Sequence, residues 1–314
     1  MKHFLIMGGT RFAGKALVED LVSSGYKVTV ISRNKTGCPA GAEQIIEERE
    51  KGLKKIQGTG FDVCFDFIGY NYQAPIEVFE YTNIKLYILI STAWLPIYFS
   101  IAADKPLSGD ERFKGKHILD KTKNYLKGKA AAEQSVNELR KRKINATSVR
   151  IPIMLGRNDH TGRLNFYRER LADGKGIILV NRGENQVQIV WHQDVAKVLK
   201  EWILFNDPAE RSVWELLPES ISLREFITEL AISGGYPLKL FSADHINIKN
   251  HLSTYLEFEP LWREENQDIT ESNLFDQLNL KPTPLSHWFQ TLESVTEISD
   301  RFLRNCEYEF ITSF

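Results

Sequence analysis

A glycine-rich turn near the start of the chain constrains the fold more than any other stretch. Residues 4–7 are apolar, and Gly8 and Gly9 follow them directly. Residues 15–24 then carry apolar side chains at helical spacing, and residues 27–31 are rich in β-branched side chains. An apolar run of four residues cannot by itself be told from a piece of helix, but this order is typical of a strand, a turn, a helix and a second strand. The first thirty residues therefore predict one βαβ unit.

The turn has the chemistry of a phosphate-binding site. Residues without a side chain let the backbone approach a pyrophosphate closely, and the helix that follows presents N–H groups and the positive end of its dipole. Gly14 comes six residues after Gly8, which suits such a turn. Glycines also end strands for steric reasons alone, but a position between a first strand and a first helix favours a dinucleotide.

Short apolar segments alternate with helical segments over the first half of the chain. Residues 86–90 are apolar at every position, as expected of a strand buried on both faces of a parallel sheet. The other expected strands are residues 44–46, 61–68 and 146–151, and the expected helices are residues 51–57, 75–81 and 122–142. Strands that alternate with helices predict a doubly wound α/β fold.

The length of 314 residues is large for a single hydrophobic core, so we expect one large domain and a smaller one. We assign residues 1–155 and 187–210 to a nucleotide-binding domain. Residues 156–186 and 211–314, where the pattern is looser, are assigned to a substrate-binding lobe.

Composition argues against several classes of protein. With 40 basic and 41 acidic residues, no net field attracts nucleic acid or anionic lipid. Cys38, Cys64 and Cys306 lie far apart without metal-ligand spacing, which fits a reducing cytoplasm. Residues 86–103 carry no charge, but Pro96 in their middle favours a buried strand and a loop over a membrane span. We therefore expect a cytoplasmic protein with neither a nucleic-acid nor a membrane partner and without a signal peptide.

The residues after the second predicted strand indicate which dinucleotide is bound. At this place a carboxylate reads the ribose 2′-hydroxyl of NAD, and a basic residue accommodates the 2′-phosphate of NADP. Residues 32–35 read Ser-Arg-Asn-Lys and contain no acid, and Arg11 lies in the glycine turn. Arg33 and Arg11 therefore favour NADP, with a solvated loop residue as the alternative interpretation of Arg33.

Two short segments carry groups suited to hydride-transfer chemistry. Ser91 and Thr92 follow the apolar strand, at the sheet edge where α/β folds collect catalytic groups. Tyr125 and Lys129 are four residues apart and share a helix face. A lysine ammonium lowers the pKa of a nearby phenol, so the tyrosine can pass a proton to or from a carbonyl oxygen. The same spacing occurs at Tyr81 and Lys85, but that pair precedes the strand, so we interpret it as structural.

Six segments, taken in order, resemble the extended or atypical short-chain dehydrogenase/reductases of the NAD-dependent epimerase/dehydratase family. They are residues 8–14, 61–71, 90–94, 125–133, 150–159 and 191–199. The resemblance implies a doubly wound parallel Rossmann sheet with a smaller C-terminal substrate lobe. It also implies an NAD(P) cofactor and, as in many members, a homodimer.

The resemblance assigns roles by position. Thr92, Tyr125 and Lys129 would be the catalytic set, and Lys129 would also hold the ribose next to the nicotinamide. The implied cofactor-binding residues are Gly8, Thr10, Arg11, Phe12 and Gly14 at the phosphates, Arg33 at the adenosine ribose, Glu48 near the adenine, and Ile68 and Gly69 along the dinucleotide.

Three departures from the family pattern bear on function. Arg11 replaces the usual middle glycine of the turn, as in a branch similar to chloroplast RNA-binding members. Ala93 and Trp94 replace the Asp-Glu pair of sugar 4,6-dehydratases, which argues against loss of water by that route. Gln188 stands where many members have an arginine for the substrate diphosphate, which weakens the assignment of a nucleotide sugar.

Further polar residues are candidates for substrate contacts. They are Ser91, Arg157, His160, Arg163 and Arg263; Arg157, His160 and Arg163 could equally belong to a solvated loop. Asp194 lies near the start of a predicted helix, where capping is the simpler role. The residues show no metal-binding cluster.

The sequence analysis predicts an NAD(P)-dependent epimerase or reductase that acts on a sugar, most simply a nucleotide-activated one. Two alternatives stay open. The first is a cofactor-bound RNA-binding or regulatory protein of the same fold, against which the complete catalytic set argues. The second is a nucleotide-sugar dehydratase that uses other acids, such as Asp110 and Glu111.

Overall fold

The computed structural model of the protein describes residues 1–96, 120–157, 159, 161–205, 207–252, 255, 261, 273–292 and 299–313. By its contacts the chain divides into two units. The first comprises Met1–Pro152, His192–Leu217 and Ile269–Leu280, and the second comprises Ile153–Trp191, Pro218–Asp268 and Lys281–Phe314. Among the described helices, none combines the length and the apolar character needed to cross a bilayer.

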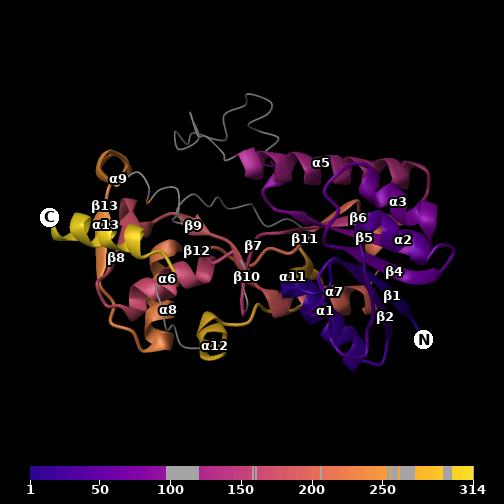
Figure 1. Ribbon diagram of the computed structural model, residues 1–314, viewed down its shortest axis with the longest axis horizontal. Coiled ribbons are helices and arrows are strands. Elements are labelled where there is room, and N and C mark those ends of the chain that lie inside the picture. Colours follow the sequence, from indigo (N-terminus) through magenta and orange to yellow (C-terminus); the bar gives the residue numbers. More distant parts are fainter. Residues whose placement is uncertain are drawn as a thin grey trace. The chain divides into compact units, whose positions relative to one another are not determined.

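A parallel sheet, seven-stranded within the described residues, forms the centre of the first unit (Figure 1). From one edge to the other the strands are β11 (Val213–Glu215), β6 (Ala146–Ile151), β5 (Asn83–Thr92), β4 (Gly60–Asp66), β1 (His3–Met7), β2 (Lys27–Ser32) and β3 (Glu43–Ile46). The chain winds outward from β1 in one direction and then returns to continue from β4 in the other. This reversal confirms the doubly wound fold, and in such folds ligands bind at the carboxyl ends of the strands beside the reversal, which here are β1 and β4.

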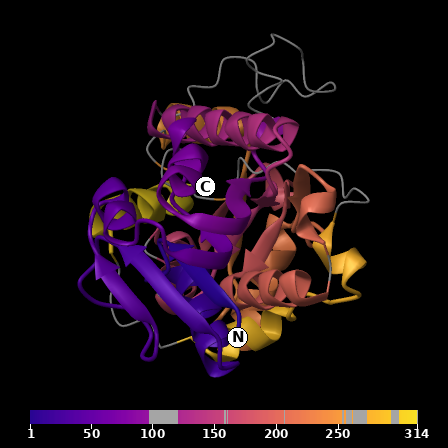
Figure 2. The same ribbon diagram turned by 90° about the vertical axis from the view of Figure 1, so that its right-hand side faces the viewer.

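Helices cover both faces of this sheet. The helices α1 (Phe12–Ser23) and α7 (His192–Phe205) pack together on one face. On the other face α3 (Gln73–Tyr81) packs against both α2 (Arg49–Lys55) and α5 (Asp120–Lys141) (Figures 1 and 2). Burial on both faces explains the unbroken apolar runs of β1 and β5, in which residues 4–7 and 87–89 are fully buried. Each such side chain stabilises the fold by roughly 1.5–3 kcal/mol.

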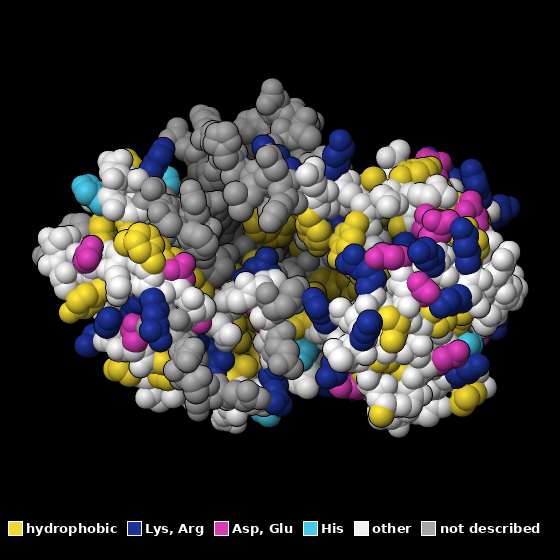
Figure 3. Space-filling model, viewed as in Figure 1, with side chains coloured by type: hydrophobic (Ala, Val, Ile, Leu, Met, Phe, Trp, Pro, Cys, Tyr) yellow, Lys and Arg dark blue, Asp and Glu magenta, His cyan; other side chains and the backbone are white. Residues whose placement is uncertain are grey.

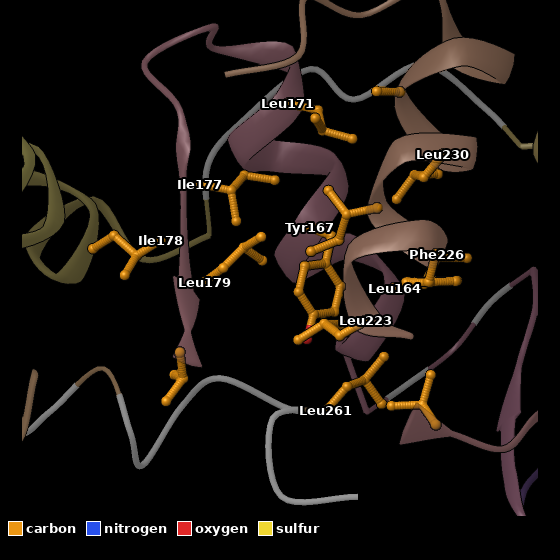
Figure 4. Close-up of a cluster of buried hydrophobic side chains, with 14 of the residues drawn as sticks. Leu164, Tyr167, Leu171, Ile177, Ile178, Leu179, Leu223, Phe226, Leu230 and Leu261 are labelled. Carbon is orange, nitrogen blue, oxygen red and sulfur yellow. The ribbon is translucent and has the colours of Figure 1, made fainter. Parts of the chain in front are cut away.

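The second unit has its own hydrophobic core. Figure 4 shows part of this core, in which Leu164, Tyr167 and Leu171 of α6 (Arg163–Ala172) face apolar side chains of α8 (Leu223–Gly234) and β8 (Ile177–Val180). The other elements of this unit are β7 (Ile153–Leu155), β9 (Gln186–Val187), β10 (Ile189–Trp191), β12 (Ile221–Ser222), β13 (Leu240–Ala243), η2 (Asn181–Gly183), α9 (His245–His251), α12 (Leu285–Gln290) and α13 (Arg301–Thr312). The short elements η3 (Pro208–Glu210) and α11 (Leu274–Gln277) belong to the first unit.

Local sequence signals explain why α8 begins and ends where it does. The Ser222 hydroxyl accepts a hydrogen bond from the Glu225 amide at 3.1 Å, and the Glu225 carboxylate accepts one from the Ser222 amide at 2.8 Å. This capping box satisfies two of the N–H groups that the first turn of a helix leaves without partners. At the other end Gly235 adopts φ 66°, the left-handed conformation that glycine adopts without steric cost.

Several boundaries differ from those expected. The helix after the glycine turn begins at Phe12 rather than at residue 15. Ser91 and Thr92 are the last residues of β5 rather than a loop after it, because they pair with Arg150 and Ile151 of β6. The first unit also includes residues 211–217 and 269–280, which the sequence analysis had placed in the lobe, whereas residues 153–155 and 187–191 lie in the second unit. The reason is tertiary: β11 extends the edge of the main sheet, whereas β10 pairs with β7.

Charged side chains of both signs are interspersed over the first unit on the face drawn at the right of Figure 3. Lys85 and Asp62 form one surface ion pair at 2.7 Å, and Lys54 and Glu50 form another at 2.6 Å. This mixture agrees with the nearly neutral net charge of the chain.

Candidate active site

The turn after β1 requires glycine at two of its positions. Gly8 adopts φ 91°, and a Cβ added to it would lie 2.7 Å from Cγ2 of Ile68. A Cβ at Gly14 would lie 3.0 Å from the carbonyl oxygen of Gly8, so the start of α1 packs directly on the turn. The structure thus has the tight backbone cradle, followed by a helix N-terminus, that suits a diphosphate.

Arg11 and Phe12 lie where the turn enters α1. Arg11 is the N-cap residue, and its side chain makes no capping hydrogen bond. Phe12 adopts φ 51°, a left-handed conformation that is strained for a bulky residue, and its ring stacks on that of His192 at 5.2 Å between centroids. Such strain is typical of functional turns, where the surrounding packing maintains it.

A hydrogen-bond network joins the glycine turn to the end of β2. The hydroxyl groups of Thr10 and Ser32 are 2.9 Å apart, and the Asn34 amide group donates to Thr10 Oγ1 at 2.9 Å. Arg11 donates to Asn34 Oδ1 at 3.3 Å. The sequence analysis missed the roles of Ser32 and Asn34, although both belong to the segment that it singled out for the ribose.

Arg33 and Glu48, expected at the ribose and the adenine, lie close to each other. Their charged groups are 3.8 Å apart, and their side chains are 77% and 65% exposed. An ion pair this exposed contributes little stability, so both side chains can exchange this contact for one with a ligand.

The loop after β4 lies beside the glycine turn. Ile68 contacts Gly8, as described above, and its amide donates to Asp66 Oδ1 at 3.0 Å. A Cβ at Gly69 would lie 2.8 Å from Leu89 Cδ1, so the loop is packed tightly against β5. Ile68 and the glycine turn are therefore brought together at the switch point of the sheet, whereas Gly69 lies one residue further on.

Of the three expected catalytic residues, Thr92 lies at the carboxyl end of β5, and Tyr125 and Lys129 lie on α5, which packs against this strand. Thr92 ends this strand, and its Oγ1 accepts a hydrogen bond from the Trp94 amide at 3.3 Å. The buried Lys129 of α5 donates from Nζ to the carbonyl oxygen of Ile90 at 2.7 Å. Tyr125, one turn earlier on α5, is 40% exposed. The hydroxyl of Thr92 and the Tyr125–Lys129 face of α5 therefore belong to one region of the first unit.

Lys129 is buried to 2% exposure, and this burial changes its acidity. The pKa of Lys129 is lowered to about 8, chiefly because the amine loses its hydration; the nearby charge of Arg49 also lowers it, and Asp66 and Glu133 act in the opposite direction. The face of the Tyr70 ring lies 4.3 Å from Nζ. Lys129 is thus held by a carbonyl oxygen and an aromatic ring.

A buried ionic network near Lys129 was not predicted from the sequence. Arg49 donates to the fully buried Asp66 at 2.7 Å and to Glu77 at 3.1 Å, and the Tyr87 hydroxyl donates to Asp66 at 2.7 Å. Burial raises the pKa of Tyr87 well above its ordinary value. The sequence signal for this network is the carboxylate of Asp66, which directly follows the apolar residues 63–65 of β4.

The expected substrate residues divide between the two units. Ser91 of the first unit is buried, and its hydroxyl has no hydrogen-bond partner among the described residues. Arg157 and Arg163 belong to the second unit, where Arg163 donates to the Thr161 hydroxyl at 3.4 Å. His160 and Arg263 lie outside the described residues, as do Asp110 and Glu111.

Two further positions that the sequence analysis singled out are Gln188, for the substrate diphosphate, and Asp194, for helix capping. Gln188 is buried in the second unit, and Asp194 is buried in the first turn of α7. Within the described part of the chain, no three His, Cys, Asp or Glu side chains gather as metal ligands would.

Comparison with known proteins identifies the family. Residues 4–210 match the model of the NAD dependent epimerase/dehydratase family. Chloroplast stem-loop binding protein of 41 kDa b from Arabidopsis thaliana is 24% identical over 259 residues, which cover 75% of this chain and 64% of that protein. The chain thus matches less than two thirds of the length of that relative.

A second relative and a solved structure extend the comparison. The decarboxylating sterol-4-alpha-carboxylate 3-dehydrogenase of Dictyostelium discoideum is 23% identical over 258 residues, 73% of this chain and 75% of that protein. The crystal structure of UDP-N-acetylglucosamine 4-epimerase from Bacillus cereus superimposes with a TM-score of 0.65 over 92% of this chain and 97% of that one, at 13% identity, which shows the common fold. Because the family model spans more than half of the sequence, the chain belongs to the NAD dependent epimerase/dehydratase family.

Proposed function

We propose that this protein is an NAD(P)-dependent epimerase or reductase that acts on a sugar, most simply a nucleotide-activated one. The observation that carries the proposal is the 2.7 Å hydrogen bond from Lys129 Nζ to the carbonyl oxygen of Ile90. It holds the helix turn that contains Tyr125 and Lys129 against the strand that ends at Thr92. A hydroxyl, a phenol and an ammonium group in one place are the groups that move a proton at a carbon that gains or loses hydride.

The residues of the first unit fit the dinucleotide that the family name implies. A Cβ would fill the cradle between Gly8 and Gly14, so the backbone at this point is shaped for a group that must come close, such as a diphosphate. When bound, the nicotinamide supplies the site that accepts or donates hydride.

Each catalytic residue then has a distinct task. The Thr92 hydroxyl orients the substrate oxygen by a hydrogen bond. Tyr125 accepts the proton of that oxygen when the substrate is oxidised and returns it when the substrate is reduced. The ammonium group of Lys129 favours the ionised form of Tyr125 and donates to ribose hydroxyl groups of the cofactor.

The names of similar proteins, rather than a contact with a bound substrate, support a nucleotide sugar as the substrate class. The epimerase of similar fold is named for a UDP-sugar. Arg157 and Arg163 of the second unit supply positive charge suited to a phosphate. Ala93 and Trp94 follow Thr92, so no acidic side chain is present there to assist the loss of water. We therefore favour epimerisation or reduction over dehydration.

Mass spectrometry of the small molecules released from the denatured, purified protein tests the proposal first. An epimerase restores its cofactor in every turnover, so a retained dinucleotide in near-stoichiometric amount supports an epimerase. An empty protein that binds NADPH from solution supports a reductase. A protein that neither retains nor binds a dinucleotide contradicts both.

We also propose that NADP(H) is preferred to NAD(H), with Arg33 and Arg11 as the groups that face the 2′-phosphate. Replacing Arg33 by alanine is expected to raise the Kd for NADPH by about ten- to a hundredfold and to leave the Kd for NADH nearly unchanged. A charge-assisted hydrogen bond contributes roughly 1.5–3 kcal/mol, and about 1.4 kcal/mol is a tenfold change in affinity.

The measurement for the Arg33 prediction is a fluorescence titration with each nucleotide. Lys35→Ala is the control because Lys35 is an exposed cation two residues away. Equal losses for both nucleotides would contradict a role for Arg33 at the 2′-phosphate.

Activity is expected to fall as the pH rises through about 8, the pKa to which burial lowers Lys129. Below this pH the ammonium is charged and favours the phenolate of Tyr125, and above it the amine is neutral. The descending limb of kcat/KM against pH should therefore have its midpoint near 8. In Lys129→Arg the guanidinium stays protonated, so the limb should move to higher pH. An unchanged limb in an active Lys129→Arg variant would assign the titration to another group.

One observation favours a second candidate function, a cofactor-bound protein that binds structured nucleic acid. The chloroplast relative is named for stem-loop binding and is 24% identical to this chain. A filter-binding titration with an RNA stem-loop at two salt concentrations would test this candidate. Nucleic-acid affinity carried by phosphate contacts falls steeply with salt, so weak retention at low salt would remove the candidate.

A further inference from the structure

The ring of Tyr70 covers the ammonium group of Lys129, a buried charge that has lost its contact with water. Lys129 is 2% exposed, and its Nζ lies 4.3 Å from the centre of the Tyr70 ring. The same ring lies 5.9 Å from the Tyr125 ring, tilted by 55°. Tyr70 therefore contacts both members of the Tyr125–Lys129 pair, although it comes from a different segment of the chain.

Packing of the Tyr70 backbone keeps this ring in place. A Cβ at Gly128 would overlap the carbonyl oxygen of Tyr70, so the loop after β4 lies directly against the backbone of α5 next to Lys129. The hydrogen bond from the Ile68 amide to the buried Asp66 holds the loop from its other side. The position of Tyr70 is thus determined at both ends of a three-residue stretch.

We propose that Tyr70 is a positioning residue of the catalytic set, whose ring face holds the ammonium group of Lys129 beside Tyr125. The inference rests on the proposed function of Lys129 but concerns a residue to which the family resemblance assigns no role. An aromatic ring has a negative face, and it attracts a cation most strongly where water is excluded. The face of the ring provides this attraction, so the phenolic hydroxyl of Tyr70 is not needed.

The other charges around Lys129 do not replace this contact. Asp66 of β4 and Glu133 of α5 favour the charged form of Lys129, whereas Arg49 of α2 opposes it. Asp66 is already bound by Arg49 and by the Tyr87 hydroxyl, and Glu133 is bound by Arg150 at 2.8 Å. Both carboxylates thus have partners of their own, and the Tyr70 ring contacts the ammonium directly.

The test is the titration of Lys129 in the full-length protein without cofactor or substrate. Side-chain NMR of protein labelled with ¹³C at the lysine Cε atoms, recorded at a series of pH values and assigned with Lys129→Arg, gives the amine pKa of Lys129 in each variant. Tyr70→Phe keeps the ring and should titrate as the natural protein does. Tyr70→Leu keeps an apolar cover without a ring, and the pKa of Lys129 should fall by about one unit, which is a tenfold lower ratio of charged to neutral amine at a given pH. Tyr72→Leu, two residues away in the same loop, should leave the titration unchanged.

A second series keeps the test decisive if Tyr70→Leu does not fold. Replacing Tyr70 by phenylalanine with one, two or three ring fluorines preserves its shape while weakening the negative face. The pKa of Lys129 should then fall stepwise with each fluorine. A titration that is the same with every ring, or the same in Tyr70→Leu and Tyr70→Phe, overturns the inference.

The experiment also separates this inference from the proposed function. The NMR titration needs no enzymatic reaction, so it decides the role of Tyr70 even if no hydride transfer is found. If hydride transfer is found, the descending limb of kcat/KM against pH should shift in Tyr70→Leu by the same amount as the amine titration and should be restored in Tyr70→Phe. A loss of activity in both variants without a shift of that limb would count against a role exerted through Lys129.

Discussion

Replacing Tyr125 by phenylalanine is expected to lower kcat by about 10²- to 10⁴-fold and to leave dinucleotide binding unchanged. Proton transfer by a positioned side chain contributes an acceleration of this size, and phenylalanine lacks the transferable proton. Tyr125 is 40% exposed on α5 and the substitution keeps its ring, so the fold should be unaffected. The loss should therefore appear in kcat rather than in the affinity for cofactor.

The chain offers a matched control for this prediction. Tyr81 and Lys85 have the same four-residue spacing, but Tyr81 ends α3 and Lys85 forms an ion pair with Asp62 at 2.7 Å. Tyr81→Phe should keep full activity. The measurement is single-turnover reduction of the bound dinucleotide, followed at 340 nm, in each variant. Equal activity of Tyr125→Phe and the natural protein would remove Tyr125 from the mechanism.

Replacing Glu307 by alanine is expected to destabilise the second unit by about 3–5 kcal/mol, the range measured when one partner of a buried ion pair is removed. Glu307 of α13 is fully buried and accepts hydrogen bonds from Arg170 of α6 at 3.0 Å and from Arg304 at 2.7 Å. Arg304 is also bound to Asp173 at 2.7 Å. Without Glu307, the Arg170 guanidinium loses its carboxylate inside the protein, and one carboxylate remains for Arg304.

Amide hydrogen exchange localises this loss of stability. Peptides from α6 and α13 should exchange faster in Glu307→Ala, whereas peptides from β1 and β5 of the first unit should not. Glu309→Gln is the control, since Glu309 lies exposed on the same helix. Unchanged exchange in α6 would show that the carboxylate does not hold the two helices together.

Much of the first unit follows from the sequence because its signals are local. The apolar run of β1, the glycine turn, the periodicity of α1 and the β-branched residues of β2 lie within about thirty residues, and each restricts its own backbone. The doubly wound fold was therefore predicted correctly, and the resemblance of six segments predicted the family. Likewise, Tyr125 and Lys129 share a helix face in any helix with their spacing.

The contacts that surround these residues were decided by tertiary structure. Arg49 and Asp66 are 17 residues apart, and Arg170 and Glu307 are 137 apart, so no sequence period relates them. The same holds for Tyr70 over Lys129. Their contact depends on the close packing of a loop against Gly128, which is a property of two segments together.

The sequence by itself thus determined the order of the elements, the place of the glycine turn and the spacing of the side chains that we propose as catalytic. Periodicity and turn chemistry act through neighbouring residues, and they leave a readable pattern. Only the tertiary structure decided which buried charges meet, that Ser91 and Thr92 extend β5, and that β11 completes the main sheet. Those outcomes depend on packing between segments that are distant in the sequence. A buried charge is stable only when it is paired, and the tertiary structure decides which partner lies near it.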